Sequence, residues 1–471
     1  MNTPVVDFVR RYAQQRTARM HMPGHKGRGP LGCEELDITE IAGADELYEA
    51  EGIIAQSEAN ATQLFSTART YYSTEGSSQC IRAMLHLALQ MRPAKAGRPV
   101  LLAARNAHKA LLYAAALLDF DIQWLWPAPD AAGALCTCPV EPEALASALD
   151  ELSAEGRTPF GVYLTSPDYL GFVQDVAGLS AVCHAHGLPL LVDNAHGAYL
   201  HFLKEGGRHP IQLGADLCCD SAHKTLPVLT GGAYLHLGTS VQADEAAVRN
   251  ALALFGSTSP SYLILQSLDA ANAVLADGFR EKLDICRWRL GMLCRELDAL
   301  RPGLALPLTG AHREPLKLTL DAAVLGLSGQ QLAQALRERG VECEYADPRY
   351  IVLMPSAESS AAEFACLQTA LHAICGEAPA ADVSVTADDP AAFAALAGAL
   401  EAQPRRFTIR EAVLAPQEMI PAAEAVGRIC AAPAVSCPPA IPIVVSGETV
   451  PPEALPLFAR YGIEKAAVVK E

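Results

Sequence analysis

The chain has 471 residues, of which about half are apolar, and a formal net charge of −17. This length and composition are typical of a folded protein with two or three domains and exclude a disordered chain. The acidic balance argues against nucleic acid and anionic membranes as partners, and the sequence lacks the roughly 20 consecutive apolar residues that a membrane span needs.

From about residue 77 to residue 240, short apolar strands alternate with helical stretches. Strands are predicted at residues 100–104, 122–126, 161–165, 188–193, 216–220 and 233–237, and helices at residues 107–118 and 178–186. Continuously apolar strands are typical of a sheet that helices cover on both faces. The sequence therefore predicts an α/β fold with a doubly wound, mostly parallel sheet.

The remainder of the chain predicts smaller units. Residues 260–300 are helical in pattern and are expected to lead from a major domain, residues 1–300, to a small α/β domain at residues 301–377. An Ala- and Pro-rich stretch at residues 378–390 is typical of a linker. A C-terminal module is expected at residues 391–471.

The cysteine and histidine patterns do not indicate a metal site. The fourteen cysteines are scattered and lack the paired spacing of metal ligands. His184 and His186 lie two residues apart in a predicted helix, so their side chains do not share a face. The N-terminus has no apolar run of the signal-peptide kind. We therefore expect a cytoplasmic protein with reduced cysteines and no bound metal.

Polar residues gather after four of the predicted strands. They are Asn106 and His108, Ser166 and Tyr169, Asp193 and His196, and the segment 221–224. Ligands of doubly wound sheets bind beyond the carboxyl ends of the strands. The sequence therefore predicts an active site at this edge.

Lys224 is the central candidate. A single lysine after a strand is most often a solvated side chain, but Ser221, His223 and Thr225 flank this one and could all donate hydrogen bonds to a phosphate. A lysine inside a cleft can lose the proton that it normally holds up to a pH of ~10.4 and can then form a Schiff base. This chemistry indicates pyridoxal phosphate as the cofactor.

Asp193 ends the apolar run LPLLVD, where a carboxylate needs a partner. It could be a turn or helix-capping residue. It could instead face the pyridine nitrogen of pyridoxal phosphate and keep it protonated, so that the ring accepts the electrons released at the substrate Cα. At about 4 Å and an effective dielectric constant near 20, such a pair is worth roughly 4 kcal/mol.

Two more motifs fit the same hypothesis. The glycine and serines of residues 76–78 precede the helical run CIRAMLHLALQM. Hydroxyl groups and free N–H groups at a helix start bind phosphate, although an ordinary serine N-cap is the alternative. His108 could lie flat over the pyridine ring, or it could cap the next helix.

As an ordered set, these motifs resemble the pyridoxal-dependent ornithine, lysine and arginine decarboxylases of bacterial type, and in particular the shorter members without an N-terminal receiver-like domain. The segments that carry the resemblance are HMPGHKG (21–27), 37–39, 52–53, 74–78, 106–109, 166–171, 193–197, 221–225 and 258–262. The tail segment PPAIPIVVSGE (438–448) is similar to the family's late proline-rich motif. The resemblance implies the aspartate aminotransferase-like fold, fold type I of these enzymes.

The resemblance also implies roles for individual residues. Lys224 matches the Schiff-base lysine, Asp193 the partner of the pyridine nitrogen and His108 the histidine that stacks on the ring. The other residues implied to contact the cofactor are Gly76, Ser77, Ser78, His196, Ser221 and His223. Thr258 and Ser259 match a loop that reaches the phosphate of a neighbouring subunit, which implies a homodimer with shared active sites. His25 and Tyr169 are implied to line the substrate side.

Five positions depart from the family's usual residues. Ala110, Asn194, Asp220, Ala440 and Ser446 stand where serine, an acidic residue, glutamine, glycine and proline are usual. None of them alters Lys224, Asp193 or His108.

The expected function is the pyridoxal phosphate-dependent decarboxylation of arginine, lysine or ornithine to the amine and CO₂, as in polyamine biosynthesis. The acid that protonates Cα would be His223, Lys224 or a cysteine. The alternatives are another reaction on the same fold, such as that of an aminotransferase or another lyase. A homologue that binds pyridoxal phosphate without turnover is a further alternative.

Overall fold

The computed structural model describes residues 1–92, 97–127, 136–378, 390–403, 406–432, 434–437 and 441–470. Its chain separates into two compact units. The first comprises residues 1–95, 160–162 and 176–283, and the second comprises residues 96–159, 163–175 and 284–471. Among the described helices, none is long and apolar enough to cross a membrane.

The main sheet has seven strands in the order β1-β7-β6-β5-β4-β2-β3. β5 pairs with β6 and β2 pairs with β3 in parallel, whereas β7 runs antiparallel to both of its neighbours, β1 and β6. The prediction of an α/β fold with a mostly parallel sheet is confirmed. The strands are β1 Arg69–Ser73, β2 Val100–Ala104, β3 Asp121–Leu125, β4 Val162–Thr165, β5 Leu190–Asp193, β6 Leu217–Asp220 and β7 Ala233–Leu237.

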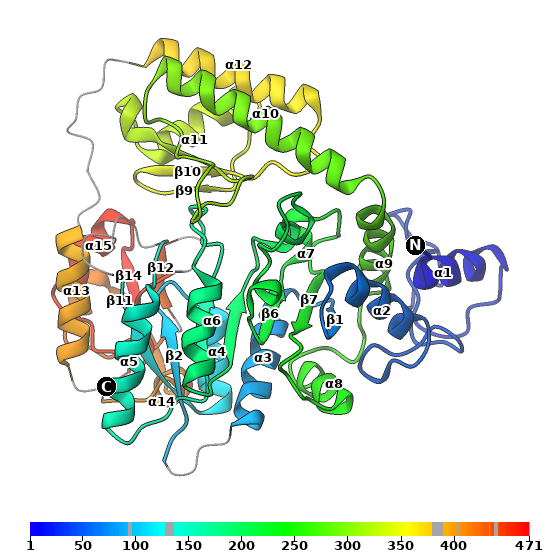
Figure 1. Ribbon diagram of the computed structural model, residues 1–471, viewed down its shortest axis with the longest axis horizontal. Coiled ribbons are helices and arrows are strands. Elements are labelled where there is room, and N and C mark those ends of the chain that lie inside the picture. The colour runs from blue at the N-terminus through cyan, green and yellow to red at the C-terminus, as the bar shows by residue number, and fades with distance from the viewer. Residues whose placement is uncertain are drawn as a thin grey trace. The chain divides into compact units, whose positions relative to one another are not determined.

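The first unit holds β1, β7, β6 and β5 with the helices around them (Figure 1). These helices are α1 Pro4–Gln14, α2 Ile53–Phe65, α3 Ser77–Met91, α6 Val176–Ala185, α7 Ala222–Thr225, α8 Glu245–Ala253 and α9 Tyr262–Ala276. Three short 3-10 helices, η1 Leu47–Glu49, η2 Ala198–Phe202 and η3 Pro210–Leu213, connect them. Helix α10, Phe279–Leu300, begins in this unit and continues in the second.

The central strands of the first unit form because every residue in them is buried. Leu190, Leu191 and Val192 of β5 are fully buried, and so are Leu217 and Cys218 of β6. Each large apolar side chain contributes roughly 1.5–3 kcal/mol when it is removed from water. β5 and β6 both end in an aspartate, so the carboxyl ends of these strands are where the buried surface becomes polar.

β1 is not predicted from the sequence. Its residues, RTYYS, are neither continuously apolar nor alternating, and yet all but Arg69 are buried. The polar atoms are satisfied by residues distant in the sequence: the Tyr72 hydroxyl bonds the side chain of Asn272 at 2.7 Å and the carbonyl of Ser57 at 2.9 Å. The strand depends on these partners, which a local pattern does not reveal.

The second unit holds β2, β3 and most of β4, a three-stranded sheet and the C-terminal part of the chain. Its further helices are α4 Lys109–Leu118, α5 Pro142–Ala154, η4 Ala322–Leu325, α11 Gly329–Arg337, α12 Ala361–Glu377, α13 Pro390–Ala402, α14 Ile409–Leu414, η5 Ala422–Glu424 and α15 Ala454–Arg460. Its further strands are β8 Leu318–Asp321, β9 Tyr345–Ala346, β10 Tyr350–Leu353, β11 Gln417–Pro421, β12 Ala434–Cys437, β13 Ile441–Val445 and β14 Lys465–Val469. Most of the predicted linker lies outside the described residues.

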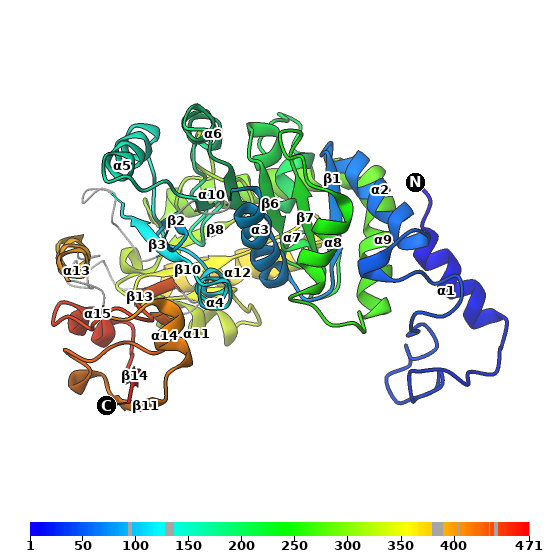
Figure 2. The same cartoon turned by 90° about the horizontal axis from the view of Figure 1, so that it is seen from below.

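Two apolar cores lie around the three-stranded sheet of the second unit. One lies between the sheet β8-β10-β9 and the helices α10, α11 and α12, which pack over the same face of that sheet (Figure 1). The other joins Tyr350 and Val352 of β10 to Phe393 of α13 and Phe458 of α15. Figure 2 shows α13, α15, β11 and β14 gathered in this C-terminal part. The predicted division into domains at residues 300 and 391 stays a prediction.

Candidate active site

Lys224 lies on α7, a helix of four residues that begins two residues after the end of β6. The Lys224 N–H group donates to the Ser221 carbonyl at 3.0 Å, which closes a turn directly after the strand. The side chain is half-buried. This is the strand-end position that the sequence predicts.

The side-chain nitrogen of Lys224 lies 3.0 Å from Nε2 of His196, which is 4 % exposed. His196 belongs to the turn that follows β5, which the Gly197 N–H group closes by donating to the Asn194 carbonyl at 2.8 Å. The ends of two adjacent parallel strands therefore bring an amine and an imidazole into contact. Such a pair can exchange a proton.

His223 is fixed from the opposite side. Its backbone N–H group and its ring Nδ1 both lie near the Gly232 carbonyl oxygen, at 3.2 and 3.0 Å. Because a carbonyl only accepts, Nδ1 carries the hydrogen. Nε2 is therefore the ring nitrogen that is left to accept or release a proton.

Asp193, at the end of β5, is 3 % exposed. Its Oδ1 accepts from the Ala195 N–H group at 3.1 Å and from the Cys219 thiol at 3.6 Å. Burial, followed by the charge of Asp193, holds the pKa of that thiol well above its usual range, so Cys219 remains a neutral donor. The Ala195 N–H group and the Cys219 thiol therefore fix the orientation of the carboxylate.

Asp220, the last residue of β6, is fully buried and binds four side chains. Its Oδ2 lies 3.0 Å from His209 Nε2 and 3.2 Å from His236 Nε2, and its Oδ1 accepts from Asn194 Nδ2 at 2.6 Å and from the Cys218 thiol at 3.7 Å. Burial alone would raise the pKa of Asp220. The charges and hydrogen bonds of the two histidines outweigh it and hold that pKa well below its usual range.

His209, Cys218 and Asp220 also place three potential metal ligands within 4.8 Å of one another. Their hydrogen bonds to each other already use the ligand atoms of the aspartate, and His209 Nδ1 accepts from the Ile211 N–H group at 3.4 Å. The cluster is therefore a complete hydrogen-bonded network.

The start of α3, where the sequence predicts a phosphate cradle, has the geometry of an anion site. Gly76 is the N-cap, with φ +70° and ψ 177°, a backbone conformation that is essentially restricted to glycine, and no side-chain oxygen caps the helix. The Ser221 hydroxyl donates to the Ser77 hydroxyl at 2.7 Å, which joins this helix start to the segment of Lys224. Ser78 is the next residue of the helix and is half-buried. Uncapped N–H groups beside two hydroxyls suit an anion.

Gln79, fully buried in the first turn of α3, ties this cradle to its surroundings. Its amide donates to the Tyr48 hydroxyl and to the Leu252 carbonyl, both at 2.8 Å, and its Oε1 accepts from Ser73 at 2.5 Å. The loop of Thr258 and Ser259 follows α8, and its Ser257 N–H group donates to Glu75 at 3.2 Å. Thr258 and Ser259 are exposed beside the cradle.

His25 is held elsewhere in the first unit. It bonds Asp37 at 3.2 Å and accepts from the Gly27 N–H group at 3.0 Å. Both views show the segment after α1, in dark blue, looping away from β6 and α7 (Figures 1 and 2). The structure therefore does not bring the HMPGHKG segment together with Lys224 of the same chain.

His108 and Tyr169 belong to the second unit. His108 is the N-cap of α4 and accepts from the Ala110 N–H group at 3.2 Å, which is the capping role that the sequence leaves open. The Tyr169 hydroxyl donates to Glu344 at 3.1 Å, and its ring lies 5.4 Å from that of Tyr345. Burial, followed by Glu344, holds the pKa of Tyr169 well above its usual range.

Arg105, three residues before His108, is buried and makes contacts that the sequence does not predict. Its guanidinium forms two parallel bonds to Glu448, at 2.9 and 3.0 Å, and donates to the Ile443 carbonyl at 3.0 Å. Trp124 and Trp126 lie against it, with ring centroids at 4.8 and 4.7 Å. Glu448 closes the late motif, so this motif anchors the C-terminal part of the chain to the residue after β2.

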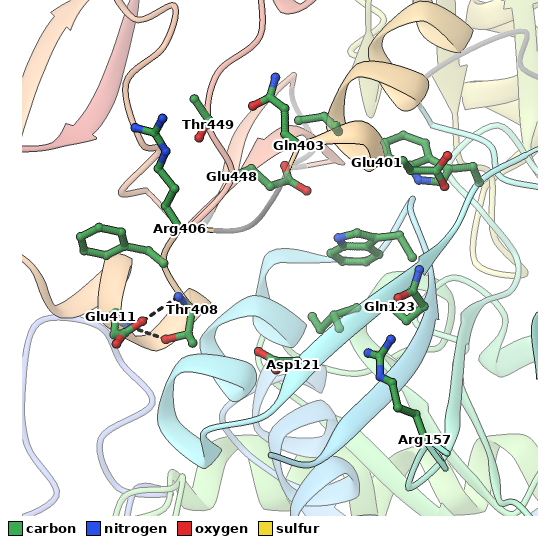
Figure 3. A pocket seen from close by; sticks show the side chains of 15 residues that line it. Asp121, Gln123, Arg157, Glu401, Gln403, Arg406, Thr408, Glu411, Glu448 and Thr449 are labelled. Atoms are coloured by element: carbon green, nitrogen blue, oxygen red, sulfur yellow. Dashed lines mark hydrogen bonds between the residues drawn. The ribbon is translucent and has the colours of Figure 1, made fainter. Parts of the chain in front are cut away.

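A cavity of about 540 Å³ lies beside this ion pair, between β3 and the C-terminal part (Figure 3). Figure 3 shows Asp121 and Gln123 on one side and Glu401, Arg406 and Glu448 on the other. Among the described residues that line it, none is a predicted site residue. The cavity is distinct from the Lys224 cluster in its residues.

The Lys224 cluster fits pyridoxal phosphate. It offers an amine, a buried carboxylate and an uncapped helix start with hydroxyls from two segments. The Thr225 hydroxyl, beside Lys224, is buried and has no hydrogen-bond partner within the described part of the chain, so a bound polar group would satisfy it.

Residues 3–286, more than half of the chain, match the model of the Orn/Lys/Arg decarboxylase major domain. The chain belongs to this family. The match extends over all the predicted site residues from His25 to Ser259, and the family accounts for the order of motifs along the chain. The decarboxylase family is pyridoxal phosphate-dependent.

Relatives match along nearly the whole chain. The Bacillus subtilis uncharacterized protein YaaO is 28% identical over 98% of this chain and 94% of its own length. An arginine decarboxylase of the same species is 27% identical over 96% of this chain and 92% of its own. The structure of the Escherichia coli constitutive lysine decarboxylase superposes with a TM-score of 0.75 at 20% identity, covering 99% of this chain and 80% of that chain. The fold of the family, fold type I, is thereby shown.

Several residues of the site region were not predicted, for physical reasons. His209 stands in the polar run EGGRHP, which gives no signal of burial. Gln79 follows two serines at the start of a predicted helix, and nothing in this local pattern indicates that its side chain is buried. Arg105 did carry a signal, because an arginine directly after the apolar strand VLLAA needs a buried partner.

Proposed function

We propose that this protein is a pyridoxal phosphate-dependent decarboxylase of a basic amino acid. The observation that carries the proposal is the contact of Lys224 with His196 at 3.0 Å, at the ends of the two strands that also position Asp193 and Asp220. Arginine is the first substrate to test, because several relatives that match nearly full length are named arginine decarboxylases. Lysine and ornithine remain the other candidates.

In this proposal, Lys224 holds the cofactor through its side-chain nitrogen. His196 Nε2, at 3.0 Å, accepts the proton that the lysine must lose before it can act as a nucleophile. Ser77, Ser221 and the N–H groups at the start of α3 hold the phosphate. Each charge-assisted hydrogen bond of this kind contributes about 1.5–3 kcal/mol.

Asp193, whose orientation the Ala195 N–H group fixes, would hold a positive charge at the pyridine nitrogen of the bound cofactor. When bound, pyridoxal phosphate supplies a sink for the electron pair that CO₂ leaves at Cα. His223 presents Nε2 as a proton donor or acceptor, because Nδ1 is occupied by the Gly232 carbonyl. It is therefore our candidate for the acid that protonates Cα, and His108 is our candidate for stacking on the ring.

We also propose a cytoplasmic homodimer. The thirteen cysteines whose side chains the structure describes are free thiols, which a reducing compartment preserves. The exposed loop of Thr258 and Ser259 and the outward segment of His25 would reach the site of a second copy. Light scattering of the purified protein measures the mass, and a monomer at working concentration would contradict this part of the proposal.

The main test is spectroscopic. The purified protein should show a visible absorbance band that borohydride bleaches and fixes, and Lys224→Ala should lose it. Lys465→Ala, which changes an exposed lysine on β14, should keep it. A wild-type protein that binds no pyridoxal phosphate would contradict the proposal.

The reaction is tested with carboxyl-labelled arginine, lysine and ornithine. Release of labelled CO₂ together with the matching amine supports decarboxylation. Formation of a keto acid without CO₂ would instead assign an aminotransferase, and bound cofactor without any turnover would assign a binding homologue.

A further inference from the structure

Asn194 and Asp220 make one side-chain contact between the ends of two adjacent strands. Asn194 follows β5 directly, and Asp220 is the last residue of β6. The Asn194 amide donates to the Asp220 carboxylate at 2.6 Å, and both residues are fully buried. The two strand ends are therefore joined by a buried donor–acceptor pair.

The network behind this contact fixes its polarity. His209 Nδ1 accepts from the Ile211 N–H group, so its Nε2 carries the hydrogen and donates to Asp220. His236 is held between Asp220 and the Thr70 hydroxyl, which lies 2.8 Å from its Nδ1. The carboxylate therefore faces donors on every side. Reversing the Asn194 amide would place two oxygen atoms together.

The network is next to the groups that would hold the cofactor. Asn194 follows Asp193 and begins the turn that carries His196, and its backbone N–H group donates to the Cys219 carbonyl at 2.9 Å. Asp220 immediately precedes the turn from Ser221 to Lys224. One side-chain bond thus links the two segments whose side chains meet in the 3.0 Å contact of Lys224 and His196.

We propose that Asp220 is a positioning residue that, through Asn194, holds the segment of Asp193 and His196 in register with the helix that carries Lys224. The inference deepens the proposed function and rests on it wherever the cofactor is the readout. Neither Asn194 nor Asp220 is required to touch the substrate.

An exchange cycle tests this inference with three variants. Asn194→Asp places two buried carboxylates in contact, Asp220→Asn removes the charge, and the double variant restores a donor–acceptor pair with its polarity reversed. In the double variant, the oxygen of the new amide can face the histidines while its nitrogen faces the new carboxylate. Asp269→Asn is the matched control, because it changes another fully buried carboxylate of the first unit, one bonded to α1 and Ser57.

The expected results are specific. Asn194→Asp weakens pyridoxal phosphate binding at least tenfold, and the double variant returns to within about threefold of the wild type. Asp220→Asn lowers the pH midpoint of the bound cofactor's absorbance band by roughly one unit, because it removes a buried negative charge from the segment that leads to Lys224. Asp269→Asn lowers the melting temperature but leaves that midpoint unchanged.

Two results would overturn the inference. One is a double variant that binds the cofactor no better than the worse single variant, and the other is a pair of single variants with wild-type affinity and an unshifted band. The melting temperatures of the cofactor-free single and double variants measure the coupling between Asn194 and Asp220 without relying on cofactor binding. If the wild type shows no cofactor band, the proposed function fails, whereas non-additive melting temperatures would still establish the Asn194–Asp220 coupling.

Discussion

Arg105 and Glu448 form a two-point ion pair inside the second unit, with both side chains at least nine-tenths buried. The two residues are separated by 343 positions in the sequence. Glu448 also accepts from the Val445 N–H group at 2.8 Å, so it bonds both its own hairpin and the residue that follows β2. The pair joins the last motif of the chain to the segment that leads to His108.

Removing one partner of this pair should strongly destabilise the second unit. Glu448→Ala leaves the guanidinium of Arg105 buried without its carboxylate, which typically costs about 3–5 kcal/mol. Urea unfolding followed by tryptophan fluorescence measures the change, because Trp124 and Trp126 lie against Arg105.

Glu342→Ala is the matched control for this experiment. Glu342 forms the same two-point contact with Arg337, but on the surface. Exposed ion pairs contribute little to the free energy of unfolding, so the urea midpoint of Glu342→Ala should equal that of the wild type. Equal effects of the two substitutions would show that burial does not decide the strength of the Arg105 pair.

His201 should make the protein sensitive to acid. Burial, followed by the charges of His209, Arg280 and His236, lowers the pKa of His201 to about 4. The unfolded chain binds this proton near pH 6.5, so the folded state binds fewer protons between pH 6.5 and 4. The contribution of the neutral His201 to the free energy of unfolding is fully present above pH 6.5. It falls by up to about 3 kcal/mol as the pH drops to 4.

Melting temperatures of the wild type and of His201→Phe, measured from pH 7 to pH 4, test this sign. A phenylalanine ring suits this aromatic site, because the ring centroid of His201 lies 5.5 Å from that of Phe65 and 5.1 Å from that of Phe202. The variant should lose less stability than the wild type over this range. Parallel curves for the two proteins would contradict the prediction.

Ser77 and Ser221 should both contribute to cofactor affinity. Ser77→Ala and Ser221→Ala should each weaken pyridoxal phosphate binding by about ten- to a hundredfold, since each removes a hydrogen bond to a charged group. Because the two hydroxyls bond each other, the double variant should lose less than the product of the single effects. Fluorescence titration measures the affinities, with Ser147→Ala on α5 as the control that should bind normally.

Gly256 should tolerate no side chain. A Cβ at this position would lie 1.9 Å from the Tyr48 hydroxyl and 2.2 Å from Gln79 Nε2, in the contact that anchors the start of α3. Gly256→Ala should therefore lower both the melting temperature and the cofactor affinity. Gly291→Ala, in the interior of α10 with open space around its Cβ, should raise the stability by roughly 0.5–1 kcal/mol instead.

The strands of the site were predictable because burial on both faces leaves a continuous apolar run, as in LPLLVD and DLCCD. The polar residues after these runs were predictable for the same reason, since parallel strands end at one edge. β1 and His209 were not predictable. Their burial depends on partners such as Asn272 and Asp220, whose proximity exists only in the fold.

The resemblance supplied the roles of the site residues, and the structure adds the contacts that link them. The resemblance marks Asn194 and Asp220 only as two separate departures from the usual residues. Their hydrogen bond shows that they are one feature. By contrast, His25 resembles a residue of the substrate side but lies in a segment that loops away from α7.

The position of Glu448 so late in the chain has a consequence for biosynthesis. A ribosome that adds about 5–20 residues per second completes Glu448 roughly 20–70 seconds after Arg105. During that interval the guanidinium and the two indoles beside it have no carboxylate to close over them. A nascent chain that stops short of the late motif therefore lacks the carboxylate that pairs with the Arg105 guanidinium between the two indoles in the folded protein.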